Sequence, residues 1–274
     1  GWDSTCPIYG GTGSAGSHSD GNVSILQSLQ DAGYKTNETL SNMYTEYCAE
    51  RPTISMSAQD WSLPEPNMKH YTDDIMNEAK DFSDTAMVVL GRPGGEGADL
   101  PTNMSAVING TYNQGLATSN APANWRYMNA TYTNNGSYDD FEEGESYLEP
   151  SVTEEQLIEK VCSEFDNVIV VINANNTMEL GWVDNYEQIK SVILAPGAGE
   201  TGFTALGEIL NGTVNPSGKT ADTYVKNLLS THYINNIGNF PYTNVDDLKA
   251  QALAADSSYK GNVSFVNYVE GIYV

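Results

Sequence analysis

The sequence predicts an α/β fold in which a doubly wound, mostly parallel sheet is sandwiched between helices. Two nearly all-apolar segments, residues 86–90 and 167–173, have the composition of strands buried on both faces of a parallel sheet. After residue 150, strand patterns alternate with helix patterns, an order typical of right-handed crossover connections. With 274 residues, 39% of them hydrophobic, the chain can bury a sizeable core, and we expect a single domain over residues 1–274.

Helical periodicity predicts three helices before the first strand. They cover residues 23–32, 38–50 and 71–82. The first ends at Ala32-Gly33, which is a normal C-terminal stop. The second places Tyr44 and Cys48 on one apolar face together with Met43 and Tyr47. The third leads into the strand at residues 86–90.

The second half of the chain shows a regular succession of elements. Thr153-Glu154-Glu155-Gln156 has the pattern of a capping box, and it opens a helix that carries Cys162 on its apolar face. The elements expected next are a strand at 167–173, a short helix near 179–189, a strand at 191–195 and a helix at 199–210. The last helix stops at Asn211-Gly212, and the tail from Thr223 onward has a mixed pattern.

A glycine-rich loop follows the first strand and presents one long carboxylate. Its sequence is Gly91-Arg92-Pro93-Gly94-Gly95-Glu96-Gly97-Ala98-Asp99. The glycines leave little side-chain crowding around Glu96, and ligands of open α/β sheets bind where such loops lie, at the carboxyl ends of the strands. Glu96 is therefore a candidate catalytic acid. The alternative is a tight turn with a solvated glutamate.

Residues 101–150 break the regular pattern. Asn, Thr, Gly and Tyr dominate this stretch, which predicts a long excursion rather than a packed element. Its start, a few residues after Glu96, favours a cover over the Glu96 loop. Its aromatic side chains have two interpretations, stacking on a ligand ring or packing the excursion onto the domain. These side chains are Tyr112, Trp125, Tyr127 and Tyr132.

Composition excludes several classes of partner. The formal net charge of -24, from 36 acidic and 12 basic residues, repels nucleic acid and anionic lipid. No apolar run is long enough for a membrane span, so we expect no membrane insertion by this chain. The cysteines Cys6, Cys48 and Cys162 are few and far apart, and no histidine has a neighbouring ligand pattern. The sequence therefore predicts no disulfide framework, no metal and no cofactor.

One glycine motif has the formal pattern of a dinucleotide fingerprint. It is Gly11-Thr12-Gly13-Ser14-Ala15-Gly16. The fingerprint requires a strand directly before it and a helix that opens on it, whereas Pro7 precedes this motif and polar residues follow. Nucleotide binding is a minor hypothesis on these grounds.

Four short motifs follow one another along the chain. They are Tyr9-Gly10-Gly11-Thr12-Gly13-Ser14, Gly94-Gly95-Glu96-Gly97-Ala98-Asp99, the stretch from Ala195-Pro196-Gly197-Ala198-Gly199-Glu200-Thr201-Gly202 to Asn215-Pro216-Ser217-Gly218-Lys219, and Glu270-Gly271-Ile272-Tyr273-Val274. In this order they resemble glycoside hydrolase family three, over almost the whole chain, and specifically its α/β sandwich domain. The resemblance implies a retaining β-glycosidase, of the β-glucosidase or β-xylosidase kind, whose site lies between a catalytic barrel and this sandwich.

The resemblance also implies roles for individual residues. Glu96 matches the family's general acid/base, while the nucleophile is an aspartate of the barrel. Thr12 and Ser14 would lie near the sugar in the leaving-group subsite, and a structural turn is the alternative for both. Arg92 and Asp99 complete the predicted substrate-binding set, with the role of holding the loop rather than contacting the sugar.

The chain also departs from the family pattern. The barrel is absent, and Asp60 in Gln59-Asp60-Trp61 is a poor nucleophile because no apolar strand precedes it and Pro64 follows. Thr220-Ala221-Asp222-Thr223-Tyr224 resembles members whose two domains are swapped in order. We therefore expect a native protein that is longer at both ends and an isolated chain that is nearly inactive.

The expected partners are an oligosaccharide or β-glycoside substrate and the catalytic barrel of the same protein. A noncatalytic carbohydrate-binding or interaction module with the same fold is the alternative function. Strong acidity and few cysteines favour a bacterial protein, extracellular or tethered to the cell surface, and leave the compartment open.

Overall fold

The computed structural model describes residues 1–18, 21–49, 51, 54, 64–96, 100–111, 140–231 and 245–258. The chain divides into two compact units, Gly1–Tyr112 with Tyr127–Lys226, and Asn113–Arg126 with Asn227–Val274. The first unit holds the sheet and the Glu96 loop. In the second, the described elements are the 3-10 helix η7 (Leu228–Ser230) and the helix α7 (Val245–Ala255).

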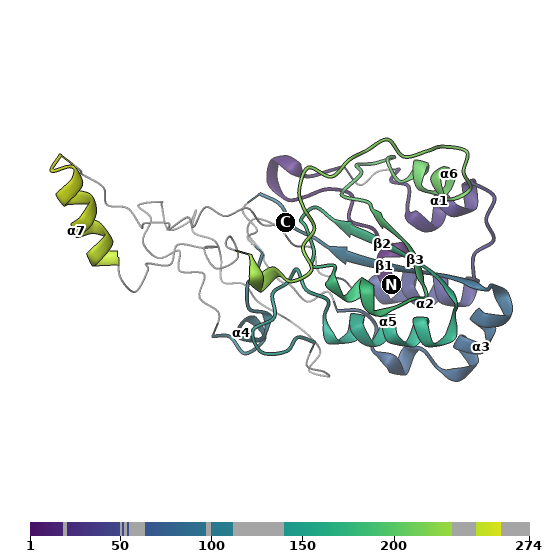
Figure 1. Ribbon diagram of the computed structural model, residues 1–274. Coiled ribbons are helices and arrows are strands. Elements are labelled where there is room, and N and C mark those ends of the chain that lie inside the picture. The colour runs from purple at the N-terminus through teal and green to yellow at the C-terminus, as the bar shows by residue number, and fades with distance from the viewer. Residues whose placement is uncertain are drawn as a thin grey trace. The chain divides into compact units, whose positions relative to one another are not determined.

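A parallel sheet forms the centre of the first unit (Figure 1). Its strands β1 (Thr85–Arg92), β2 (Asn167–Ala174) and β3 (Ile189–Leu194) lie in the order β1-β2-β3. In register, Val88 lies opposite Val170 and Val170 opposite Val192. The predicted α/β class and the two apolar strands are confirmed.

The helices α1 (Ile25–Asp31) and α6 (Thr204–Leu210) cover one face of the sheet (Figure 1). The buried cluster on this face consists of Ile25, Val89, Val171, Phe203 and Leu206. Gly207 allows the close approach of the two helices, since a Cβ there would collide with the carbonyl oxygen of Ser28. The Gly207 N–H donates to Ser28 Oγ at 2.9 Å.

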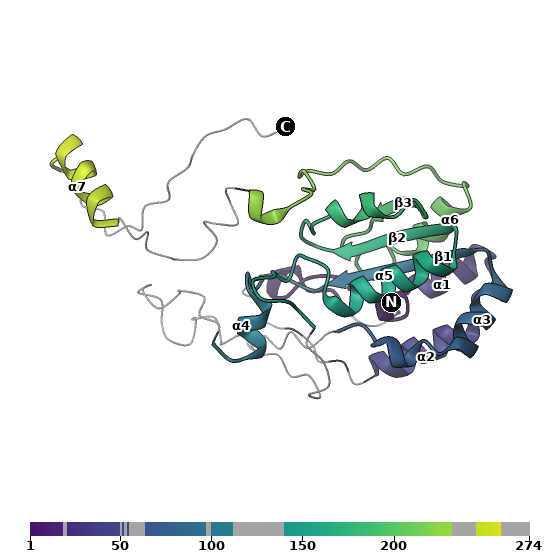
Figure 2. The same cartoon turned by 60° about the horizontal axis from the view of Figure 1, so that its bottom comes forward.

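The helix α5 (Val152–Glu164) covers the opposite face, where Val88 and Leu90 point by strand alternation (Figures 1 and 2). Its buried apolar residues are Leu157, Ile158, Val161 and Cys162, which confirms the predicted core position of Cys162. The 3-10 helix η1 (Trp2–Ser4) contacts β1 and the helix α2 (Glu38–Cys48). The helix α3 (Asp73–Phe82) contacts α2, and the 3-10 helix η3 (Met68–His70) contacts α5. The three helices predicted before the first strand are thus confirmed, with small differences at their ends.

The predicted capping box of α5 is wrong by two residues. Ser151 is the N-cap, and Glu154 completes the box by accepting from the Ser151 N–H. Thr153 instead lies buried within the first turn, and its hydroxyl bonds the carboxylate of Asp140. Both Ser151 and Thr153 fit the capping pattern in sequence, and the tertiary bond to Asp140 decides between them.

Two predicted helices are shorter than expected. The helix near residues 179–189 is only the 3-10 helix η6 (Gly181–Asn185), because the chain becomes extended at Tyr186, with φ -125° and ψ 101°. The helix expected at 199–210 begins only at Thr204 and follows a series of turns at residues 199–203. Gly199 cannot belong to it, since its φ of 68° is left-handed. Its predicted stop at Asn211-Gly212 is confirmed.

Both ends of the stretch predicted as an excursion, residues 101–150, are packed. The helix α4 (Met104–Ile108) joins a buried cluster of Ile54, Met104, Val107, Phe141 and Tyr147. A backbone bond of 2.7 Å from the Met104 N–H to the Glu145 carbonyl ties the two ends together. Residues 112–139 lie outside the described part, so the cover over the Glu96 loop stays a prediction.

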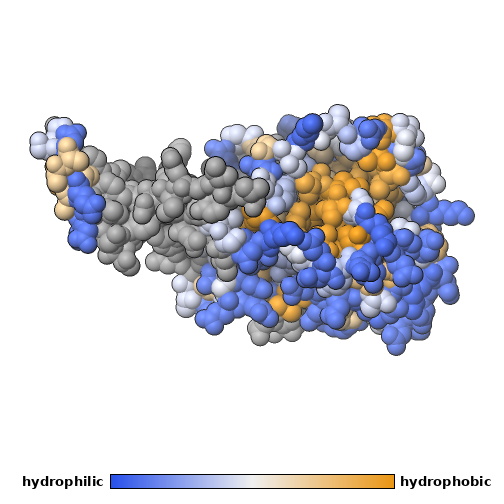
Figure 3. All heavy atoms as spheres, viewed as in Figure 1, coloured by the Kyte–Doolittle hydropathy of each residue, from blue (hydrophilic) through white to orange (hydrophobic). Residues whose placement is uncertain are grey.

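The outer strand β3 is only partly buried. Its apolar residues Val192, Ile193 and Leu194 have intermediate exposure, and among the described residues no strand pairs with its outer edge. Figure 3 shows apolar side chains gathered on the surface where β3 lies. Within the described ranges, no helix combines the length and apolar character that a membrane crossing requires.

Arg92, at the carboxyl end of β1, fixes this strand to the segment before α5. Its side chain is only 4% exposed and forms an ion pair with Glu154, whose side chain is equally buried. Every N–H of the guanidinium has an acceptor. Nε donates to the Tyr147 carbonyl at 2.5 Å, and Nη2 donates to the Glu149 carbonyl at 2.8 Å. The network joins the end of the strand to residues 147–154.

Glu154→Ala should lower the free energy of unfolding by about 3–5 kcal/mol, because it leaves the buried charge of Arg92 without its partner. Urea denaturation of the chain measures the change. The matched control is Glu164→Ala on the same helix, which breaks more exposed pairs with Lys80 at 2.7 Å and Lys160 at 2.9 Å. We expect about 1 kcal/mol or less for the control. Equal losses for the two variants would contradict the importance of the buried pair.

Candidate functional site

The Glu96 loop leaves the carboxyl end of β1 and lies against the loop that follows Tyr9. Gly95 makes this approach possible, since a Cβ there would collide with the backbone and side chain of Thr12. A Cβ on Gly11 would lie 2.9 Å from the Gly94 carbonyl oxygen. The glycines of the two motifs therefore allow two loops from distant parts of the sequence to touch.

Asn173, near the end of β2, holds the second loop in place. Its fully buried side-chain amide accepts from the Ile8 N–H at 2.6 Å and donates to the carbonyls of Ile8 at 3.2 Å and Ala195 at 2.7 Å. The Gly199 N–H adds a bond of 2.7 Å to the Tyr9 carbonyl. Residues 8–16, which include the 3-10 helix η2 (Gly13–Ala15), thus lie at the carboxyl edge of the sheet.

Ser14 and Thr12 contact Glu96 directly. The backbone N–H of Ser14 donates to Glu96 Oε2 at 2.8 Å, and the Ser14 hydroxyl donates to the same oxygen at 2.5 Å. Thr12 Oγ1 donates to the Glu96 carbonyl at 2.5 Å. The family resemblance implies that the hydroxyls of Thr12 and Ser14 lie near a sugar. In the structure, both hydroxyls bond the loop that carries the candidate acid.

The Glu96 carboxylate is exposed and ionised at neutral pH. The hydrogen bonds from the Ser14 hydroxyl and backbone lower its pKa below the ordinary value. Within the described residues its Oε1 atom accepts no hydrogen bond. One oxygen is thus held by the protein while the other is available to a reacting group.

The other predicted site residues lie apart from this carboxylate or outside the described residues. Arg92 is buried, and its guanidinium bonds only protein groups, so it has no N–H left for a sugar. Asp99, Asp60 and the aromatic residues Tyr112, Trp125, Tyr127 and Tyr132 lie outside the described residues.

A small cavity of about 240 Å³ adjoins the two loops. Thr12 and Gly94 border it, together with three polar residues that the sequence did not single out, His18, Asn22 and Arg51. Asn22 Oδ1 is buried and accepts no hydrogen bond from any described residue. No local pattern marks these residues, because the cavity brings together separate loops.

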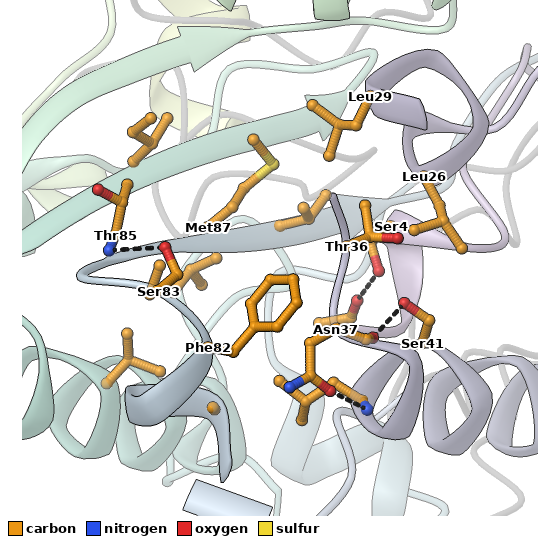
Figure 4. Close-up of a pocket in the computed structure, with 18 of the residues that line it drawn as sticks. Ser4, Leu26, Leu29, Thr36, Asn37, Ser41, Phe82, Ser83, Thr85 and Met87 are labelled. Carbon is orange, nitrogen blue, oxygen red and sulfur yellow. Dashed lines mark hydrogen bonds between the residues drawn. The ribbon is translucent and has the colours of Figure 1, made fainter. Parts of the chain in front are cut away.

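A larger cavity, of about 550 Å³, lies elsewhere (Figure 4). Its walls are mainly apolar, with Leu26, Leu29, Phe82 and Met87 among them, and it borders the amino end of β1 near Thr85. Neither Glu96 nor the loop at residues 10–14 borders it. Ligands of parallel sheets bind at the carboxyl ends of strands, so Glu96 and not the larger cavity marks the candidate site.

The glycine motif at residues 11–16 lacks the structural context of a dinucleotide site. No strand precedes it in the described chain, and only the three-residue 3-10 helix η2 opens within it. Among the described residues, no group of His, Cys, Asp and Glu side chains is arranged to hold a metal ion.

Several relatives are bacterial β-glucosidases. Beta-glucosidase A of Butyrivibrio fibrisolvens is 28% identical over 188 residues, which make up 68% of this chain and 19% of that protein. Thermostable beta-glucosidase B of Acetivibrio thermocellus is 38% identical over 104 residues, or 36% of this chain and 13% of that protein. The matched part of the chain thus spans less than one fifth of the length of these relatives.

Solved structures and a family profile agree with these relatives. A beta-glucosidase from Paenibacillus barengoltzii has a TM-score of 0.59 at 25% identity, over 84% of this chain and 21% of that chain. Beta-glucosidase 3B from Thermotoga neapolitana, solved with glucose, has a TM-score of 0.60 at 21% identity, over 90% of this chain and 28% of that chain. At this identity the similarity shows the fold alone. The profile described as the glycosyl hydrolase family 3 C-terminal domain matches residues 1–274, and the chain therefore belongs to glycosyl hydrolase family 3 as a domain of that C-terminal type.

Proposed function

We propose that this domain supplies Glu96 as the general acid/base of a retaining β-glycosidase whose nucleophile lies in another domain of the same protein. The observation that carries the proposal is the position of the Glu96 carboxylate, exposed at the carboxyl edge of the sheet and held through one oxygen by Ser14. The β-glucosidase names of the relatives support a β-glycoside as the substrate.

Two carboxyl groups about 5 Å apart perform the reaction in a retaining enzyme. One attacks the anomeric carbon, while the other protonates the oxygen of the leaving group and then removes a proton from the water that hydrolyses the glycosyl-enzyme. Glu96 would perform both proton transfers through Oε1, since Ser14 bonds the other oxygen. The first carboxylate would come from the catalytic barrel.

The two proton transfers demand different charge states of Glu96. Its bonds with Ser14 stabilise the carboxylate and so suit the second transfer, in which Glu96 acts as the base. The first transfer requires a protonated carboxyl. Burial beneath the barrel and the substrate would raise the pKa of Glu96 for this step, as desolvation does for the acids of other glycosidases.

Thr12 has a supporting role in this proposal. Its hydroxyl fixes the backbone of Glu96, and its position on the border of the small cavity leaves the neighbouring surface open to a leaving group.

We also propose that Asp99 holds the loop that carries Glu96.

Glu96→Gln in the protein that includes the barrel should slow hydrolysis of β-glycosides with poor leaving groups by about 10²–10⁴-fold, because general acid catalysis is lost. Glycosides with a dinitrophenyl leaving group need no protonation and should still form the glycosyl-enzyme. Added azide, which needs no general base, should then restore their turnover. Steady-state kinetics with both substrate types measure these effects.

Glu208→Gln is the matched control, since this exposed carboxylate lies on α6 away from the two loops. It should leave both rates unchanged. If Glu96→Gln leaves hydrolysis of both substrate types intact, the catalytic acid lies elsewhere and Glu96 is a turn residue. Sugar binding by the isolated domain that Glu96→Gln does not change would then favour a noncatalytic carbohydrate-binding module.

Ser14→Ala should raise the pKa of Glu96 toward its ordinary value. The variant loses the bond from the Ser14 hydroxyl, which lowers this pKa more than the bond from the backbone N–H does, and it keeps the backbone bond. A ¹³C NMR titration of the Glu96 carboxyl in this chain measures the shift directly. Ser17→Ala, on the same segment, is the control and should leave the titration unchanged. An unchanged pKa in Ser14→Ala would show that the hydroxyl does not hold the carboxylate.

A further inference from the structure

Two cysteines that are distant in sequence meet beside η1. Cys6 follows this 3-10 helix, and Cys48 is the last residue of α2. Thr5 Oγ1 lies 3.7 Å from Cys6 Sγ and 3.5 Å from Cys48 Sγ, so both sulfurs contact the same hydroxyl. Both are free thiols in this structure.

The environments of the two thiols differ in accessibility. Cys48 is buried, and its Sγ donates to the Trp2 carbonyl at 3.4 Å. Cys6 is partly exposed. An oxidant in solution therefore reaches Cys6 more readily than Cys48.

Their charge states differ as well. The neighbouring Cys48 side chain, together with Thr5 and the nearby Arg51, lowers the pKa of Cys6 to about 6 against the effect of its burial. The pKa of Cys48 is raised by the neighbouring Cys6 and by burial. Besides Arg51, the titratable groups among the described residues that face this pair are Asp3, Tyr9 and the amino group of Gly1.

We propose that Cys6 and Cys48 form an oxidation site, in which Cys6 is the nucleophile toward a hydroperoxide and Cys48 resolves the product to a reversible disulfide. A partly exposed cysteine beside a buried one, with the Arg51 guanidinium bonded to its carbonyl, is the arrangement found in reactive dithiols. The site does not depend on the glycosidase proposal, because neither cysteine contacts Glu96.

The chemistry balances with hydrogen peroxide as the only co-reactant. The Cys6 thiolate attacks one peroxide oxygen, the O–O bond breaks, and hydroxide leaves and takes up a proton as water. The Cys6 sulfenic acid is then attacked by Cys48 sulfur, which gives up its proton; the S–O bond breaks and a second water leaves. Two thiols are oxidised to one disulfide while the peroxide is reduced to water.

The experiment is peroxide oxidation of the folded chain, followed by thiol counting and peptide mapping by mass spectrometry. Of the three thiols, we expect two to be lost with a mass decrease of about 2 Da, a Cys6–Cys48 linked peptide, and full recovery with dithiothreitol. Cys162→Ser, which removes the buried cysteine of α5, is the matched control and should behave like the unchanged chain.

Single variants separate the two roles. Cys48→Ala should stop at a Cys6 sulfenic acid that dimedone traps, and Cys6→Ser should show no rapid oxidation at all. Since Cys48→Ala can weaken folding, the rate of iodoacetamide labelling in the unchanged chain provides a second readout, and Cys6 should react at least tenfold faster than Cys162. Equal labelling rates, or disulfides that form only between chains, would overturn the proposal.

Discussion

The side-chain amide of Asn173 is the interaction on which the arrangement of the site depends. It is fully buried at the end of an otherwise apolar strand, where an amide without partners would be costly. Its bonds to the backbone of Ile8 and Ala195 satisfy it, and they anchor the start of residues 8–16 to the sheet. Because Ser14 belongs to that segment, the amide indirectly determines where the Glu96 carboxylate is held.

Buried polar groups thus fix both sides of the candidate site. Asn173 determines the position of the loop that donates to Glu96, and Arg92 ties the end of β1 to residues 147–154. Apolar packing between the sheet and its helices supplies the cohesion of the fold, but it would tolerate small displacements of a loop. Hydrogen bonds with defined partners do not tolerate such displacements, and they fix the contact between the two loops.

The parts of the structure that follow local patterns were predictable. The apolar strands β1 and β2, the helix α2 and the loop that carries Glu96 could all be read from neighbouring residues. The Ser14–Glu96 bonds, the Asn173 contacts and the meeting of Cys6 with Cys48 were missed, since they join residues far apart in sequence. The capping error at Ser151 has the same cause, because a contact with Asp140 decided it.

The half-exposed outer edge of β3 affects how the isolated domain behaves in solution. Parallel strands are normally covered on both faces, and an uncovered apolar edge is a template on which another chain can add a strand. Among the described residues no strand pairs with the outer edge of β3, although Ile193 packs against the cluster of α1 and α6. With this edge uncovered, the domain would be prone to concentration-dependent aggregation through it, although its strong negative charge opposes the approach of a second copy.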